Sequence, residues 1–113
     1  MSKKSLATSP DAVLFTTAST TISAVDSATY MIGSAGAVTL TVPAPVIDGV
    51  VITFVSTTAQ AHVVASTGSV MQNGVTANRA QATLDSVAGA GLSIISFRTS
   101  WYVISEVASP TYA

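Results

Sequence analysis

Short apolar or alternating runs follow one another along the chain, separated by breaks rich in glycine, proline and aspartate. Val, Ile and Thr dominate the runs; these β-branched residues favour strands, and helical patterning is nearly absent. A spacing of about ten residues between runs is typical of an all-β domain, and we expect an antiparallel β-sandwich or barrel-like domain with short strands that forms oligomers. The expected strands are Val13–Thr17, Thr20–Val25, Thr29–Ile32, Ala37–Val42, Val50–Ser56, His62–Ser66, Gln81–Leu84, Leu92–Arg98 and Trp101–Val107.

The breaks carry turn residues, including Pro43-Ala-Pro45 and Asp48-Gly49, and Asn73-Gly74 is a favoured hairpin dipeptide. No clean internal repeat is visible, so the sequence does not favour a solenoid. We expect a flexible N-terminal arm over residues 1–11, a single β-domain over 12–108 and a short C-terminal tail over 109–113.

The alternation differs from strand to strand. Val38–Val42 has one apolar and one hydroxylated face, as expected for a strand with one side in water. Val50–Val55 and Leu92–Phe97 carry bulky apolar groups on both faces, which indicates a central strand of a sandwich or a second face covered by another subunit. The residues expected at such a subunit or partner interface are Val51, Phe54, Val55, Ile95, Phe97, Trp101 and Tyr102.

Charge is scarce: 8% of residues are charged, against about 25% in an ordinary soluble domain. A neutral, hydroxyl-rich surface would explain this, and so would a surface covered by copies of the chain, since a net charge of −1 gives little repulsion. Four basic residues make no phosphate-binding patch, which argues against a nucleic-acid partner. The apolar run Val50–Val55 is far shorter than the ~20 residues of a membrane-spanning helix, and the first residues do not read as a signal peptide.

Reactive side chains are few and scattered. There is no cysteine, and His62 has no nearby acid, so we expect no metal, no cofactor and no catalytic residues. Trp101 and Tyr102 point to opposite faces of the last hairpin. One of them could stack on a sugar ring, or Trp101 could close the core with Phe97.

Five segments occur in an order that resembles a known group of proteins: LTVPAP, DGVVITFVS, AHVV, VMQNG and LSIISFRTSWYVIS. Across residues 37–107 the chain resembles small β-domains of tailed-bacteriophage virion proteins, including capsid decoration (cement) proteins and head or tail fibre modules. The resemblance implies a non-enzymatic virion component, usually a homotrimer, that stabilises the capsid by bridging subunits of the major capsid protein.

We therefore expect a capsid decoration protein that binds itself and the major capsid protein, is made in the host cytoplasm without a signal peptide and resides on the capsid surface. The N-terminal arm, with Lys3, Lys4 and Leu6, is the expected capsid-contacting segment. The alternative is a glycan- or receptor-binding module of a phage tail or head fibre, or of an adhesin. An enzyme is disfavoured because no catalytic constellation is visible.

Overall fold

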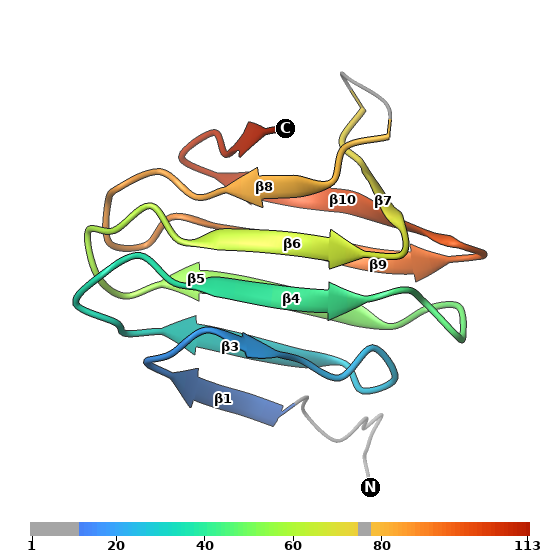
Figure 1. Cartoon of the computed structure of the whole chain (residues 1–113), viewed down its shortest axis with the longest axis horizontal. Helices are drawn as coiled ribbons and strands as arrows, with labels where there is room; N and C mark the ends of the chain where they lie inside the picture. Colours follow the sequence, from blue (N-terminus) through green and yellow to red (C-terminus); the bar gives the residue numbers. More distant parts are fainter. Residues whose placement is uncertain (1–11, 75–77) are drawn as a thin grey trace, which may run out of the picture.

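The computed structural model describes residues 12–74 and 78–113 and folds them into two mixed β-sheets packed face to face (Figure 1). Sheet A has the strand order β1-β3-β5-β9-β10-β7, and sheet B has the order β11-β8-β6-β4-β2. The all-β prediction is confirmed, with no helix among the described residues. The strands are β1 (Ala12–Thr16), β2 (Thr20–Thr21), β3 (Ala28–Ile32), β4 (Thr39–Pro43), β5 (Val51–Ser56), β6 (Val63–Thr67), β7 (Val70–Gln72), β8 (Gln81–Thr83), β9 (Gly91–Phe97), β10 (Ser100–Val107) and β11 (Thr111–Tyr112).

The first six strands alternate between the two sheets, so the chain winds in coils, and neighbouring coils pair in parallel. This departs from the expected antiparallel arrangement and from the expectation that the chain would not wind as a solenoid. The coils differ in length: Ala12 pairs with Ala28, 16 positions later, and Ala28 pairs with Ile52, 24 positions later. Because the turns differ in length, the coils leave no fixed period in the sequence.

The strands after β6 add to the two sheets mainly by antiparallel pairing. In sheet A, β9 pairs with β5 and β10 with β9; in sheet B, β8 pairs with β6 and β11 with β8. The Asn73-Gly74 break is not a two-residue hairpin, because the chain passes there from β7 in sheet A to β8 in sheet B. Residues 109–113, expected as a tail, are part of the fold: Thr111–Tyr112 forms β11, and Ala113 exchanges backbone hydrogen bonds with Gln81.

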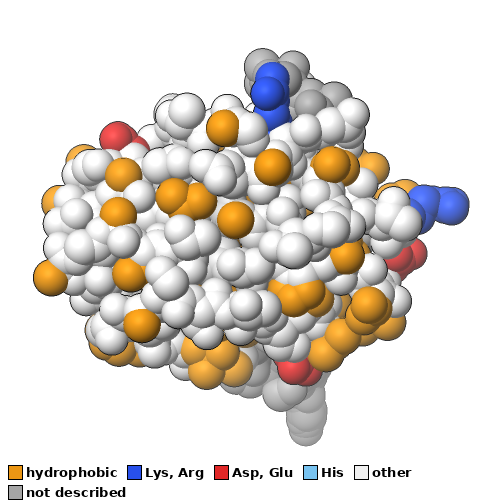
Figure 2. Space-filling view, viewed as in Figure 1, with side chains coloured by type: hydrophobic (Ala, Val, Ile, Leu, Met, Phe, Trp, Pro, Cys, Tyr) orange, Lys and Arg blue, Asp and Glu red, His pale blue; other side chains and the backbone are white. Residues whose placement is uncertain are grey.

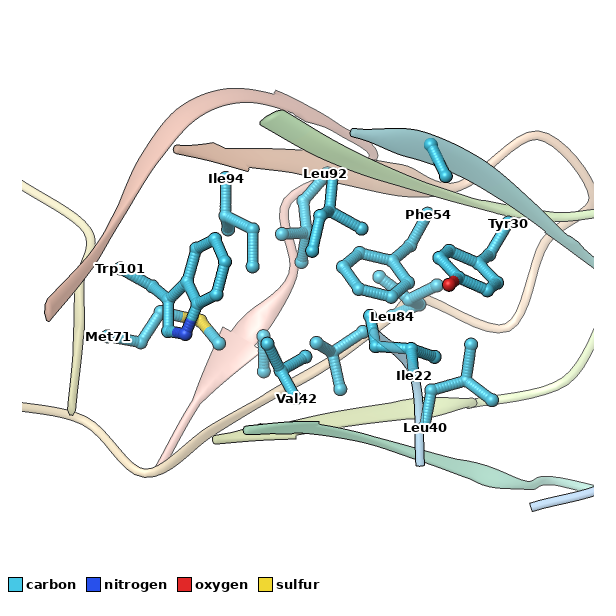
Figure 3. Close-up of a cluster of buried hydrophobic side chains, with 14 of the residues drawn as sticks. Ile22, Tyr30, Leu40, Val42, Phe54, Met71, Leu84, Leu92, Ile94 and Trp101 are labelled. Carbon is cyan, nitrogen blue, oxygen red and sulfur yellow. The ribbon is translucent and has the colours of Figure 1, made fainter. Parts of the chain in front are cut away.

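The core lies between the sheets (Figure 3). Strand alternation fills it: Leu40 and Val42 point inward from β4 while Thr39 and Thr41 point outward, as the sequence pattern predicted. Trp101 is fully buried beside Met71, and its indole N–H donates to the carbonyl oxygen of Pro43 at 3.0 Å. Further along the core, Phe54 of β5 stacks on Tyr30 of β3 with ring centroids 5.9 Å apart. Because these side chains fill the space between the sheets, the alternate side chains of each strand lie on an outer face of its sheet.

Candidate functional site

The outer face of sheet A carries apolar side chains in rows that cross the strands. The pairing register places Val51, Ile95 and Tyr102 in one row, and Phe15, Met31, Val55 and Val107 in another. Between them runs a row of hydroxyl groups, Thr29, Thr53, Ser93 and Ser105. We call these residues, with Phe97 at the end of β9, the outer A face.

Several bulky members of the outer A face are open to solvent. Phe15 is 69% exposed, Val107 57%, Phe97 46% and Tyr102 40%. Within the hydroxyl row, the oxygens of Thr53 and Ser93 lie 2.8 Å apart and hydrogen-bond to each other. This bond uses one of the two hydroxyl hydrogens, so a partner that covers the pair would have to offer an acceptor to the other.

No described charged residue belongs to the outer A face. Five of the six lie in connections between strands: Asp26, Asp48, Arg79, Asp85 and Arg98. The sixth, Glu106, is on β10 but accepts a hydrogen bond from the hydroxyl of Tyr112 on sheet B. A partner could therefore cover the strand rows of the outer A face without desolvating a charge, and the nearest cation is Arg98 beside Phe97.

An aromatic cluster with a cation closes one corner of the outer A face. The rings of Phe97 and Tyr102 meet edge to face, with centroids 6.3 Å apart. The Arg98 guanidinium carbon lies 5.1 Å from the centre of the Phe97 ring. The backbone N–H of Arg98 donates to Asp48 Oδ1 at 2.7 Å, which ties this turn to the loop before β5. Aromatic and arginine side chains are the groups most enriched at protein interfaces.

The outer face of sheet B is different. Its rows are Thr21, Thr41, Ala65 and Gln81, and Thr39, Val63, Thr83 and Thr111. Apart from Val63 and Gln81, these side chains are alanine or threonine, and no aromatic ring is among them. Figure 2 looks onto this face, and the charged side chains of the described residues are seen only near its margin. The two outer faces therefore suit different surroundings. The outer face of sheet A is suited to a protein partner, and the outer face of sheet B is suited to water.

The sequence-based interface residues divide between the outer A face and the core. Val51, Val55, Ile95, Phe97 and Tyr102 lie together on the outer A face. The other two need a correction: Phe54 and Trp101 are 0% exposed, because each points inward from its strand while the following residue points outward. Trp101 does close the core, but beside Met71, since Phe97 lies on the opposite face.

Three residues of the expected capsid-contacting arm, Lys3, Lys4 and Leu6, lie outside the described residues. Sequence reasoning missed Phe15, Met31 and Val107 on the outer A face. The strand itself was expected, as Val13–Thr17, but the sequence does not say that it lies beside β3.

The described residues include no group of three His, Cys, Asp or Glu side chains that could hold a metal ion. His62 is fully buried, with Nδ1 3.1 Å from the backbone N–H of Val38 and Nε2 3.1 Å from the hydroxyl of Thr58. Both ring nitrogens are used inside the fold, and burial lowers the pKa of the imidazole. His62 is placed as a structural residue.

No helix in the described part of the chain is long and apolar enough to cross a membrane. No model of a known protein family matches the chain, and no curated protein matches its sequence.

Proposed function

We propose that this protein is a non-enzymatic structural subunit that works by binding another protein surface through its outer A face. One observation carries the proposal: the strands of the outer A face combine exposed aromatic and aliphatic rows with no described charge, while the equally uncharged rows of sheet B carry no aromatic ring. Exposed apolar side chains raise the free energy of the free protein in water. A partner that covers them removes this unfavourable contribution, which is why exposed apolar patches mark interaction sites.

The proposed setting is a phage virion, where the chain acts as a capsid decoration protein that binds the outer surface of the major capsid protein. Support comes from the order in which the sequence segments from LTVPAP to LSIISFRTSWYVIS occur within residues 37–107, which resembles phage virion β-domains. The low charge of the chain also supports it. We propose that it forms a homo-oligomer, a trimer by the same resemblance, and reaches the capsid from the host cytoplasm.

The stabilising effect would come from buried apolar area. Each Å² of apolar surface removed from water contributes about 25 cal/mol, reduced by the cost of ordering both partners. A decoration protein repeated over a capsid lattice multiplies this contribution across many subunit boundaries.

The test compares matched variants for binding to purified capsids of the phage that encodes the chain. Ile95→Lys places a charge in the middle of the outer A face, and Thr83→Lys places the same charge on the outer face of sheet B. We expect the unaltered protein and Thr83→Lys to co-sediment with capsids and raise their resistance to heat, and Ile95→Lys to do neither. Equal binding by both variants would contradict the role of the outer A face, and no binding by the unaltered protein would contradict the decoration function.

A second candidate is a glycan- or receptor-binding module of a fibre or adhesin. The exposed rings of Phe97 and Tyr102 favour it, because aromatic faces can stack on sugars. The burial of Trp101 removes the larger ring from consideration. A glycan array would test this candidate: hits that disappear in Tyr102→Ala would support it, and the absence of hits would count against it.

A further inference from the structure

Strand β1 is an edge strand with little cover, since four of its five residues are exposed. It lies at one end of sheet A (Figure 1), and no described strand pairs with its other edge. Its apolar side chains are open on both faces: Val13 and Phe15 are 69% exposed on one side and Leu14 is 43% exposed on the other. An open edge presents unpaired backbone donors and acceptors, and the group that satisfies a row of them is another strand.

The two ends of the molecule differ. At the far end, β11 adds to sheet B, Pro110 is buried, and the hydroxyl of Tyr112 donates to Glu106 on sheet A, so the chain itself bridges the two sheets. At the β1 end, Leu14 pairs in register with the core residue Tyr30 and shares its inward face, yet Leu14 is half exposed. The edge of sheet B there is the two-residue strand β2, too short to cover it. The core is thus left open on this side in the described residues.

β1 also lacks the features by which proteins protect open edges. Natural edge strands carry charges, prolines or bulges that discourage pairing. Ala12–Thr16 and its neighbour Ala28–Ile32 contain no charge and no proline, and their five-residue register has no irregularity. Two copies meeting through Ala12–Thr16 would bring no like charges of the described residues together, and the chain's net charge of −1 adds little repulsion.

We propose that two copies of this chain pair through β1, antiparallel and about a two-fold axis at Leu14, so that sheet A runs continuously from one copy into the next. In this register Leu14 faces Leu14 of the second copy, and Val13 faces Phe15 of the second copy. Both Leu14 side chains then close the open ends of the two cores, and both sets of Val13 and Phe15 side chains cover each other. The contact is self-complementary, as a two-fold interface requires.

This contact goes beyond the proposed capsid binding and does not depend on it, since β1 lies at the margin of the outer A face. A two-fold contact joins copies in pairs. The assembly in solution therefore contains an even number of chains: a dimer, or a hexamer where trimers form as well.

A cysteine cross-link tests the register, because the chain has no cysteine of its own. Residues directly opposite each other across antiparallel strands have Cβ atoms about 4.5–5.5 Å apart, close to the distance that a disulfide spans, whereas diagonal neighbours are about 7–8 Å apart. Leu14→Cys in the full-length chain should form a disulfide-linked dimer under mild oxidation. Val13→Cys, which faces Phe15 of the second copy, should cross-link far more slowly.

Val87→Cys is the matched control for random collision, because Val87 is 44% exposed against 43% for Leu14 and lies in the turn between β8 and β9. We expect Leu14→Cys to cross-link at least ten times faster than Val87→Cys. Equal rates for the two variants, or a faster rate for Val13→Cys, would overturn the proposed register.

A second measurement does not depend on cysteine chemistry. Native mass should show an even number of chains for the unaltered protein. Leu14→Lys, which places two like charges at the axis, should halve that number, while Val87→Lys leaves it unchanged. A thermal melt of each variant shows whether it is folded. A monomeric unaltered protein, or a folded Leu14→Lys with unchanged mass, would overturn the proposal. Loss of capsid binding in Ile95→Lys with the even mass retained would separate this contact from the proposed function.

Discussion

His62 Nδ1 accepts a hydrogen bond from the backbone N–H of Val38 at 3.1 Å, across the turns of two successive coils. On the other side of the ring, the Thr58 hydroxyl donates to the Ser34 carbonyl oxygen at 2.7 Å, so it accepts from Nε2 rather than donating to it. The imidazole is therefore neutral, with its proton on Nε2. One buried side chain fastens the turn after β5 to the turn after β3.

Replacing His62 should destabilise the fold in proportion to the hydrogen bonds lost. His62→Leu leaves the Val38 N–H without an acceptor inside the protein, and we expect a loss of about 1–3 kcal/mol in the free energy of unfolding. His62→Asn keeps an acceptor near the position of Nδ1 and should lose less. Urea unfolding measures both, and equal losses for the two variants would contradict the importance of the Val38 contact.

The stability of the fold should fall on mild acidification because of this histidine. Burial lowers the pKa of His62 below its ordinary value of 6.5, so the unfolded chain takes up a proton at a higher pH than the folded chain. The contribution is complete above pH 6.5 and declines as the pH falls from 6.5 toward the lowered pKa, by at most about 1.4 kcal/mol per pH unit.

Urea unfolding at pH 7.0 and pH 5.5 checks this dependence, since carboxyl groups ordinarily titrate nearer pH 4. His62→Asn is the control and should lose less stability than the unaltered protein between the two pH values. The same pH dependence in both proteins would assign the effect to other groups.

Gly91 should tolerate no larger side chain. A Cβ atom at this position would lie 2.1 Å from the carbonyl oxygen of Phe54, within the β5–β9 pair at the centre of sheet A. We expect Gly91→Ala to cost about 1–3 kcal/mol or more, because the backbone of a central strand has to move. Gly36→Ala is the matched control: a Cβ there meets nothing within 4 Å, and the change should stay within about 0.5 kcal/mol. Thermal or urea unfolding distinguishes the two.

Trp101 is the only tryptophan, so its fluorescence reports on one site. Because it is 0% exposed, we expect a blue-shifted emission maximum and weak quenching by acrylamide in the folded protein. Trp101→Ala should cost about 3–5 kcal/mol by leaving a cavity in the core. A red-shifted, readily quenched signal in the folded state would contradict the burial of this ring.

The sequence predicted most strands because each strand's alternation is a local property. Thr39 and Thr41 against Leu40 and Val42 marked one wet and one buried face, and the structure has that arrangement. Pairing is a different matter, since it depends on residues far apart: Phe54 lies opposite Leu92, 38 positions later. Parallel coils with turns of unequal length leave no local signature, so the parallel pairing of β1, β3 and β5 was missed.

Two strands were missed because they are short and carry little pattern of their own. Val70–Gln72 and Thr111–Tyr112 are strands only because β10 and β8 supply their hydrogen-bond partners. The outer A face was predicted only in part, because a strand's alternation is visible in the sequence but its inward side is not. Apolar residues on both faces of Val50–Val55 showed that a second face existed, but only the fold separates inward Phe54 from outward Val55.

The unequal coils also indicate that a turn between strands should accept an inserted foreign peptide. Parallel pairing between β3 and β5 sets the register of the strands, and the turns only have to span the gap between the sheets. Ala35, Gly36 and Ala37 are exposed at the tip of such a turn, beyond the Ser34 carbonyl that Thr58 holds. A peptide inserted between Ala35 and Gly36 would lengthen one coil without disturbing its neighbours. If the protein coats a capsid, every copy could then present that peptide on the particle.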